Sequence, residues 1–302
     1  MTAAGRPGSM ARAVTLFRVS GIPIRVHASW LVIFGLIAWS LSVGYFPYVL
    51  PGVPAAAYWI QGLVAALLLF VSVFLHELSH SVVAQAHGLP VSAITLHVFG
   101  GVSQLQREPD GPGVEFQMAV AGPLTSFGLA AVAAAGAAAI PGAPAIAAIL
   151  RYLALINALV GAFNLVPGFP LDGGRILRAV LWRARGDHAW ATRVASRAGG
   201  GVAAGLIGLG VLRGLTGEFL GGLWLVLIGL FLREAAVGSY RQLVVRRALA
   251  PLRVRDVMTR VVVSVPPQRA VAEVVDETFW RHHVSSFPVV DGGRVLGILG
   301  LE

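Results

Sequence analysis

The segment that decides the fold class is Leu67-Leu-Leu-Phe-Val-Ser-Val-Phe-Leu-His-Glu-Leu-Ser-His80, where an apolar run leads directly into two histidines and a glutamate. It closes a stretch from Val26 to His76 that contains no Asp, Glu or Arg. Roughly 20 apolar residues suffice for one helix across a bilayer, and this stretch is much longer. Only 12% of the chain is charged, about half the usual share in soluble domains. The sequence therefore predicts a polytopic membrane protein.

Further uncharged runs extend this pattern to about six membrane-spanning helices. The longest of these runs cover Phe116 to Leu150 and Tyr152 to Leu171. The expected spans are Ala28 to Phe46, Tyr58 to His80, Glu115 to Ile140, Ala145 to Leu165, Ala198 to Leu212 and Leu220 to Ala236. The expected fold is thus a helical bundle within the membrane.

The distribution of arginine predicts how the spans are oriented, because cytoplasmic loops carry an excess of basic residues. The N-terminal segment and the tail after the sixth span are rich in arginine, and the loops after the first and third spans carry no charge. A loop expected after the fourth span carries Arg175, Arg178, Arg183, Arg185, Arg193 and Arg197. Both termini are therefore expected in the cytoplasm, with the protein in the cell membrane. Orientation explains the net charge of +9, so we expect no nucleic-acid partner.

The segment Val91 to Leu105, between the second and third spans, is rich in β-branched residues on either side of Gly100-Gly101. This pattern predicts short strands joined by a turn or bulge. Strands at membrane depth must be covered by protein or line a wet cavity, because lipid cannot satisfy their backbone groups.

The motif His76-Glu77-Leu78-Ser79-His80 carries the first chemical signal. Residues four apart share one face of a helix, so both imidazoles can bind one zinc ion with Glu77 beside it as general base. The motif alone also occurs by chance, but ionisable residues inside a membrane span are functional by default. We therefore interpret it as a metal site.

A catalytic zinc usually takes three protein ligands, and the chain has no cysteine to supply one. Asp172 is the best third ligand, because it follows the fourth span and therefore comes to the same side of the membrane as the two histidines. The alternative interpretation of Asp172 is an aspartate that caps the next helix. Glu108, Asp110 and Glu115 compete for the role, but they lie in a loop rich in proline and glycine that is expected to be solvated.

Several motifs together resemble the site-2 protease family of intramembrane zinc metalloproteases. They are the H-E-x-x-H pattern, Asn164-Leu-Val-Pro-Gly-Phe-Pro-Leu-Asp172-Gly-Gly, the Phe99-Gly-Gly segment and Ala121-Gly122-Pro123. The opening Phe17-Arg-Val-Ser-Gly-Ile-Pro-Ile-Arg-Val-His-Ala-Ser-Trp30 is similar to the subgroup with a C-terminal CBS module.

The resemblance implies a role for each matching residue. His76, His80 and Asp172 would be the zinc ligands, and Glu77 the catalytic acid and base. Asn164 would donate a hydrogen bond near the scissile carbonyl, and Pro167 and Pro170 would shape the loop that presents Asp172. The strands around Gly100, Gly101 and Val102 would hold an unwound substrate by strand addition.

The composition after Arg247 becomes that of a soluble domain. A strand is expected from Val261 to Val265, a helix from Val271 to Trp280, and two strands from Ser286 to Leu299 joined at Asp291-Gly292-Gly293. This pattern resembles part of a CBS domain, a module that typically pairs with a second copy to bind adenosine nucleotides. We expect a protease domain over 1–247 and a partial, truncated CBS domain over 248–302, with nucleotide binding by this chain in doubt.

The expected function is an intramembrane zinc metalloendopeptidase that cleaves a membrane-spanning or membrane-associated substrate near the cytoplasmic face. Family members release membrane-held transcription regulators or clear remnant signal peptides, and the sequence does not select between these substrates. Homodimerisation is left open. One alternative is a transporter or channel, but the sequence has neither internal repeats nor charges scattered through several spans. Another is a catalytically silent family member that only binds membrane clients.

Overall fold

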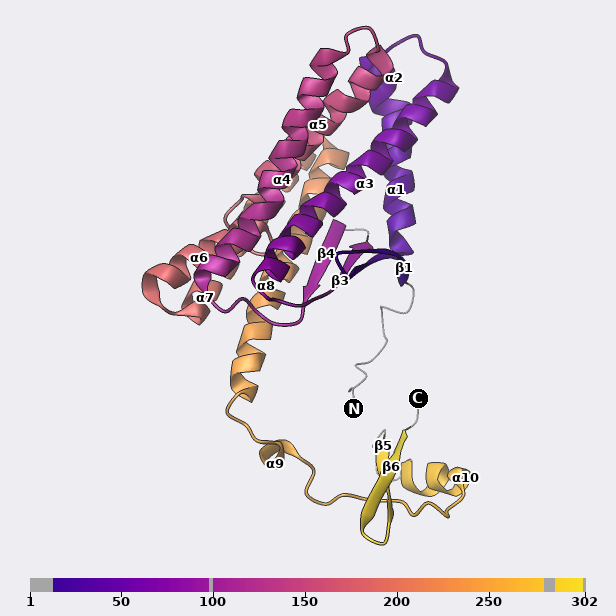
Figure 1. Cartoon of the computed structure of the whole chain (residues 1–302), viewed down its shortest axis with the longest axis vertical. Coiled ribbons are helices and arrows are strands. Elements are labelled where there is room, and N and C mark those ends of the chain that lie inside the picture. The colour runs from indigo at the N-terminus through magenta and orange to yellow at the C-terminus, as the bar shows by residue number, and fades with distance from the viewer. Residues whose placement is uncertain (1–12, 98–99, 280–285, 301–302) are drawn as a thin grey trace. The chain divides into compact units, whose positions relative to one another are not determined.

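The computed structural model describes residues 13–97, 100–279 and 286–300 (Figure 1). The chain divides into two compact units, Met1–Val244 and Val245–Glu302. The first unit contains the long helices and a small sheet, and the second contains short helices and a strand pair.

Six helical segments of the described residues are long and apolar enough to cross a membrane, as the sequence predicted. The first consists of α1 (Ser29–Ser40), the π-helix η1 (Leu41–Tyr45) and α2 (Phe46–Val49). The others are α3 (Ala55–Ala86), α4 (Pro112–Ala139), α5 (Pro144–Asn164), α7 (His188–Leu215) and α8 (Phe219–Leu249). The helical α7 begins at His188 rather than at the expected Ala198, because the Asp187 carboxylate caps it by accepting from the Ala189 and Trp190 amides.

Small residues allow α3, α4 and α5 to pack closely. Ala65 on α3, Ala133 on α4 and Ala148 on α5 are all buried, and small side chains let helix backbones approach each other in membrane proteins. Large apolar residues such as Leu31 and Val132 are instead exposed on the outside of the bundle. Small residues inside the bundle and large apolar residues on its surface are the arrangement expected where that surface faces lipid.

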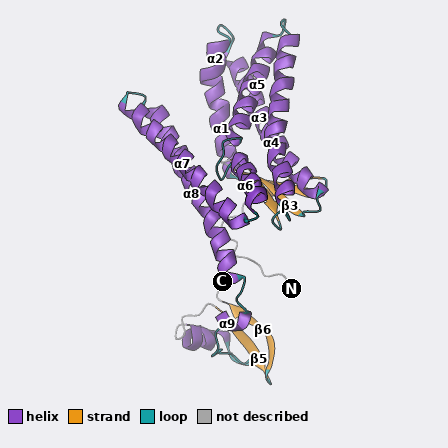
Figure 2. Cartoon of the chain, turned by 90° about the vertical axis from the view of Figure 1, so that its left-hand side faces the viewer, coloured by secondary structure: helices purple, strands orange, loops and turns teal. Residues whose placement is uncertain are grey.

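Helix α6 (Asp172–Arg185) corrects one expectation, because the arginine-rich segment after the fourth span is not a loop. The helix ends at Gly186, which adopts a positive φ of 73°. Arg193 and Arg197 lie within α7. Figure 2 shows α6 beside the ends of α4 and α7, so the segment brings Asp172 to the bundle as the first residue of a helix.

A four-stranded sheet lies beside α3, in the order β1 (Ala13–Val19), β2 (Ile22–His27), β3 (Val91–His97) and β4 (Gly100–Leu105). The expected strands β3 and β4 are confirmed, but Gly100 and Gly101 are the first residues of β4 and do not form the expected turn or bulge. The sequence patterns did not predict β1 and β2. Strands β2 and β3 pair in parallel, and the other pairs are antiparallel.

The apolar face of the sheet packs on α3. Ile22, Ile24 and Ile94 form a buried cluster with Phe74 and Leu78 of α3. Strand β4 is at one edge of the sheet. The sheet therefore places an edge strand next to the helix that carries the H-E-x-x-H motif.

The second unit contains α9 (Val254–Val257), α10 (Val271–Val274), η2 (Val275–Phe279), β5 (Ser286–Asp291) and β6 (Arg294–Gly300). The expected strand pair around Asp291-Gly292-Gly293 is present, with positive φ at both glycines. The prediction of a strand from Val261 to Val265 is wrong, because within this segment only Val265 forms a β-bridge, and its partner is Val289. The expected helix over 271–280 is split into α10 and η2, and Trp280 lies outside the described residues. The domain ranges 1–247 and 248–302 stay a prediction.

Candidate metal centre

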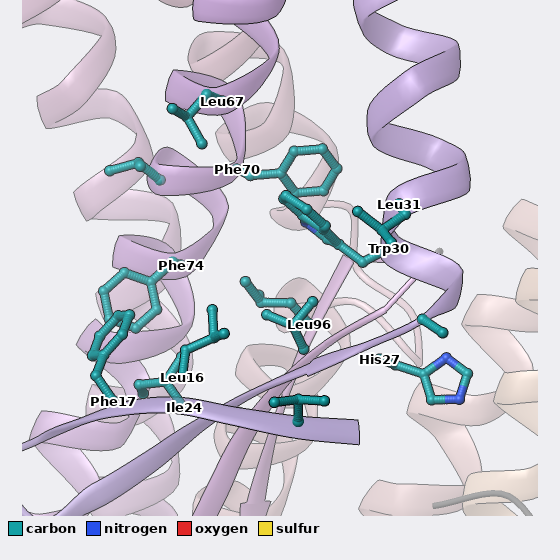
Figure 3. A pocket seen from close by; sticks show the side chains of 14 residues that line it. Leu16, Phe17, Ile24, His27, Trp30, Leu31, Leu67, Phe70, Phe74 and Leu96 are labelled. Atoms are coloured by element: carbon teal, nitrogen blue, oxygen red, sulfur yellow. The ribbon is translucent and has the colours of Figure 1, made fainter. Parts of the chain in front are cut away.

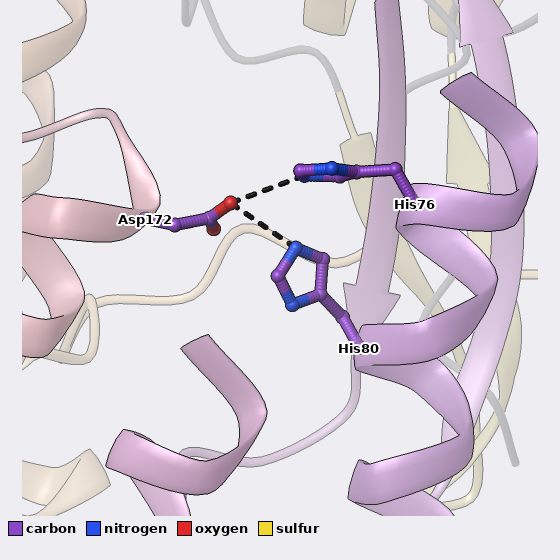
Figure 4. Close-up of side chains that lie close together, drawn as sticks. All are labelled: His76, His80 and Asp172. Atoms are coloured by element: carbon purple, nitrogen blue, oxygen red, sulfur yellow. Dashed lines mark hydrogen bonds and ion pairs between the residues drawn. The ribbon is translucent and has the colours of Figure 1, made fainter. Parts of the chain in front are cut away.

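Three side chains from two helices converge inside the first unit (Figure 4). His76 and His80 lie one turn apart on α3, and Asp172 begins α6. The Asp172 Oδ2 atom is 3.1 Å from His76 Nε2 and 3.2 Å from His80 Nε2. Both histidines are almost fully buried. The three ligand atoms lie within 4.8 Å of one another, so this group could hold a metal ion.

The spacing of these atoms suits a tetrahedral zinc site. Zinc bonds to histidine nitrogen and carboxylate oxygen are about 2.0–2.2 Å long, which separates tetrahedral ligand atoms by roughly 3.3–3.6 Å. The observed separations of 3.1 and 3.2 Å are close to this range. Burial alone would raise the pKa of the Asp172 carboxyl, but the hydrogen bonds and charges of the two histidines outweigh it and hold that pKa well below its usual range. Asp172 is therefore an anionic donor.

The Nδ1 atom of each histidine ring, the nitrogen that does not face Asp172, contacts a group on helix α4. His80 Nδ1 lies 2.6 Å from the carbonyl oxygen of Met118, and His76 Nδ1 lies 2.9 Å from Ser126 Oγ. Because a carbonyl only accepts, Nδ1 of His80 must carry the proton. In the neutral ring its Nε2 lone pair then faces the Asp172 carboxylate, and a cation between the two, either a second ring proton or a metal ion, resolves that arrangement. Such outer contacts fix the ring orientation of metal ligands, so the residues fit a metal.

Gly122 on α4 explains why this helix can approach the centre. A Cβ at Gly122 would overlap with the Nε2 atoms of both His76 and His80. Gly122 belongs to the Ala121-Gly122-Pro123 motif, so a sequence signal for it existed. Ser126 and the carbonyl of Met118 had none, because their contacts with the histidines arise only when α3 and α4 pack together.

The expected substrate-binding strand lies against the expected general base. A Cβ at Gly101 would overlap with the Glu77 side chain, so β4 and α3 are in close contact there. Gly100 pairs with His97, Gly101 with Leu96, and Val102 with Thr95 on β3. The other side of β4 is the edge of the sheet. The structure thus places Gly101 against Glu77, and the substrate-binding roles of Gly100, Gly101 and Val102 stay predictions.

The residues expected between the fourth span and Asp172 form a compact turn. Asn164 is the last residue of α5 and is half-buried, and Pro167 and Pro170 are exposed. The Phe169–Pro170 bond is cis. Gly173 and Gly174 on α6 pack so closely on the backbone of 165–169 that neither site has room for a Cβ. This close packing holds the turn that leads into Asp172, and the roles of Asn164, Pro167 and Pro170 stay predictions.

Glu115 corrects another expectation, because it is fully buried rather than solvated. Its Oε1 atom accepts from Arg178 Nε at 2.7 Å and also from Arg178 Nη2. The Arg178 guanidinium lies over the Phe169 ring, 5.0 Å from its centroid. Glu108 and Asp110 are exposed, as expected. Glu115 therefore does not compete with Asp172 for a metal, but ties helix α6 to α4.

Comparison with known proteins agrees with this geometry. The profile of "Peptidase family M50" matches residues 64–150 and 142–205, and that of "CBS domain" matches residues 254–302. The chain is 40% identical over 297 residues to the "Putative zinc metalloprotease Rip3" of Mycobacterium tuberculosis, covering 97% of this chain and 75% of the relative. A zinc metalloprotease of Methanocaldococcus jannaschii is 32% identical over 293 residues, covering 96% and 78%.

A solved structure is also similar, the "Site-2 Protease from Methanocaldococcus jannaschii". It superposes with a TM-score of 0.50 at 31% identity, covering 76% of this chain and 95% of that one. With its six apolar helices, the chain is a multi-pass membrane protein. It belongs to peptidase family M50, the site-2 protease family of zinc metalloproteases.

Proposed function

We propose that this protein hydrolyses a peptide bond in a membrane-spanning or membrane-associated substrate, near the cytoplasmic face of the cell membrane. The observation that carries the proposal is the contact of Gly101, on the edge strand β4, with Glu77, which lies between the two histidine ligands on α3. A backbone that can pair with an extended peptide is thereby next to a carboxylate that can move a proton.

His76, His80 and Asp172 would hold the zinc ion. When bound, zinc polarises the carbonyl that is attacked and lowers the pKa of a coordinated water towards about 7. Glu77 would accept the proton of the attacking water and return it to the leaving amine, as a general base and then a general acid. Ser126 and the Met118 carbonyl keep the two imidazoles in the orientation that this requires.

The edge strand addresses the main obstacle to cleavage of a membrane-spanning helix. Such a helix hides its peptide bonds in its own hydrogen bonds, and unwinding it in an apolar setting costs several kcal/mol for each unpaired group. Pairing with β4 around Gly100, Gly101 and Val102 would replace those bonds. Asn164, at the end of α5, would donate a hydrogen bond to the scissile carbonyl, and Pro167 and Pro170 would fix the turn before Asp172.

The arginine distribution supports cytoplasmic termini. The segments before α1 and after α5, and the end of α8, hold most of the arginines. Membrane-held transcription regulators and remnant signal peptides both have the required form of a single apolar helix. The CBS match covers one copy, residues 254–302, so an adenosine nucleotide site would need a second copy, for which a homodimer is one source.

The test is cleavage of a panel of single-span peptides by the purified protein, with and without a zinc chelator. We expect cleavage to be lost under chelation and in Glu77→Gln. Glu234→Gln, which changes an exposed glutamate in the same way, serves as the control and should remain active. Cleavage that survives Glu77→Gln would contradict the assigned base. A silent family member would show zinc binding but no difference between the two variants.

A further inference from the structure

A pair of serines connects strand β4 to the helix that carries Glu77. Ser81 lies one turn after Glu77 on α3 and is fully buried, and Ser103 on β4 is partly buried. Their Oγ atoms are 2.9 Å apart. Ser81 Oγ also donates to the carbonyl oxygen of Glu77 at 3.0 Å. Neither hydroxyl is used in the proposed catalysis, so their contact needs a separate explanation.

The direction of these two hydrogen bonds follows from the groups involved. A carbonyl oxygen only accepts, so the single hydroxyl proton of Ser81 is directed at Glu77. The contact between the serines then requires Ser103 to be the donor and Ser81 Oγ to be the acceptor. The side chain of Ser103 is thus tied, through Ser81, to the backbone of the expected general base.

Two contacts between α3 and β4 have matching spacings along the helix and along the strand. Gly101 lies against Glu77, and Ser103 donates to Ser81. Glu77 and Ser81 are four residues apart, a rise of about 6 Å along a helix. Gly101 and Ser103 are two residues apart, about 6.7 Å along a strand. The helix and the strand can therefore run side by side in the same direction and make both contacts at once.

The apolar neighbours of these contacts do not define the register of β4. On β3, Ile94 pairs with Ser103 and Leu96 pairs with Gly101. Leu96 also lines an apolar groove together with Phe74 of α3 (Figure 3). Apolar burial is not directional, so contacts of this kind are compatible with more than one register of the strand.

The two glycines at the start of β4 permit a second register. A slip of one residue turns every side chain of a strand to the other face, so Gly100 instead of Gly101 would lie against Glu77. Because glycine has no Cβ, this register would also avoid the overlap with Glu77 that a larger residue would cause. It would, however, bring Val102 opposite Ser81 and leave the Ser81 oxygen without its donor.

We propose that the hydrogen bond between Ser81 and Ser103 selects the register of β4 and thereby determines which substrate bond lies next to Glu77. Successive residues of a strand direct their backbone groups to opposite edges, so a slip of one residue changes which residues of β4 can pair with a peptide at the free edge. The paired peptide would then shift along β4, and a neighbouring bond would come to Glu77. The two serines are positioning residues, and this inference rests on the proposed function.

The experiment compares Ser103→Thr with Ser103→Val in the full chain. These two side chains have nearly the same shape, but only threonine keeps a hydroxyl. Ser92→Val is the control for valine in place of serine, since Ser92 is exposed on the neighbouring strand β3. Mass spectrometry identifies the products from a panel of single-span peptides, and hydrogen exchange of the β4 amides is measured without substrate. Zinc content and gel filtration show that each variant is folded.

We expect the wild type, Ser103→Thr and Ser92→Val to cut each accepted peptide mainly at one bond. Ser103→Val should also cut the neighbouring bond and should lose about 2- to 10-fold in kcat/KM at the original bond, the range that corresponds to one buried hydrogen bond. Its β4 amides should exchange faster by a similar factor. Ser81→Ala removes the acceptor of the same bond, so it should add little when combined with Ser103→Val.

The comparison of threonine with valine makes the proposal refutable. A single unshifted cleavage site in Ser103→Val, at whatever rate, would overturn it. Equal spreading of the cleavage site in Ser103→Thr and Ser103→Val would also overturn it, because the size of the side chain would then be the cause. If the wild type cleaves no peptide, the proposed function fails and hydrogen exchange decides the positioning role. Faster exchange of β4 in Ser103→Val but not in Ser103→Thr would support that role, and equal exchange would refute it.

Discussion

Replacing Arg178 by Met should weaken both the fold and the metal centre. Glu115 is fully buried, and the Arg178 side chain, which is only 13% exposed, provides its partner. Methionine keeps the length of the side chain but leaves the glutamate charge without compensation. Removing one member of a buried ion pair costs about 3–5 kcal/mol, a large part of the roughly 5–15 kcal/mol by which native proteins are stable. The loss of the contact with Phe169 adds to this cost.

The effect should reach the metal because Arg178 and Asp172 are on the same short helix. Arg178 ties α6 to α4, the helix whose Ser126 and Met118 orient the histidines. Loss of a direct hydrogen-bond partner of a metal ligand typically reduces metal affinity about 10- to 100-fold, and Arg178 acts one step further away, so its loss should reduce the affinity by less. We therefore expect a lower unfolding temperature in detergent, and a weaker zinc affinity in competition with a chromogenic chelator.

Two controls make this prediction refutable. Arg183→Met removes an exposed arginine from the same helix and should change neither quantity. The double variant Glu115→Met/Arg178→Met removes both charges and should recover most of the stability, because replacing both partners of a buried pair by apolar residues is far less costly than removing one. Native zinc affinity and native unfolding temperature in Arg178→Met would show that the pair does not support the centre.

Three further changes test other parts of the structure. Gly122→Ala should abolish zinc binding, measured by metal analysis of the purified protein, because its Cβ overlaps with both histidine rings, whereas Gly128→Ala on the same helix has free space and should retain zinc. Ser126→Ala should weaken zinc binding about 10-fold or more by releasing His76, and unchanged affinity would contradict that role. Asp187→Ala should cost about 1 kcal/mol of stability in denaturant unfolding, since it removes the cap of α7.

Much of the membrane domain followed from local features of the chain. A helix turn places His76 and His80 on one face whatever surrounds it, and the thickness of a bilayer sets the length of each apolar run. Asp172 could be matched to the histidines because successive spans alternate in direction, so that the end of the second span and the end of the fourth reach the same side. Each of these constraints acts within one segment or depends only on the order of the segments along the chain, so each can be read from the sequence.

Contacts between distant segments had to come from the tertiary structure. Strand β2 pairs in parallel with β3, so that Ile24 meets Ile94, and no local pattern in either segment specifies that partner. Glu115 lies next to prolines and glycines, which predicted a solvated loop, yet its burial is decided by Arg178 on another helix.

The sequence by itself thus determined the membrane spans and the three residues that could hold a metal, because helix periodicity and bilayer thickness act on each segment separately. Only the tertiary structure decided which groups orient the histidines, why Gly122 has no side chain, and which strand lies against Glu77. Each of these depends on two segments meeting at a distance of a few ångströms, and that meeting is a property of the packed chain.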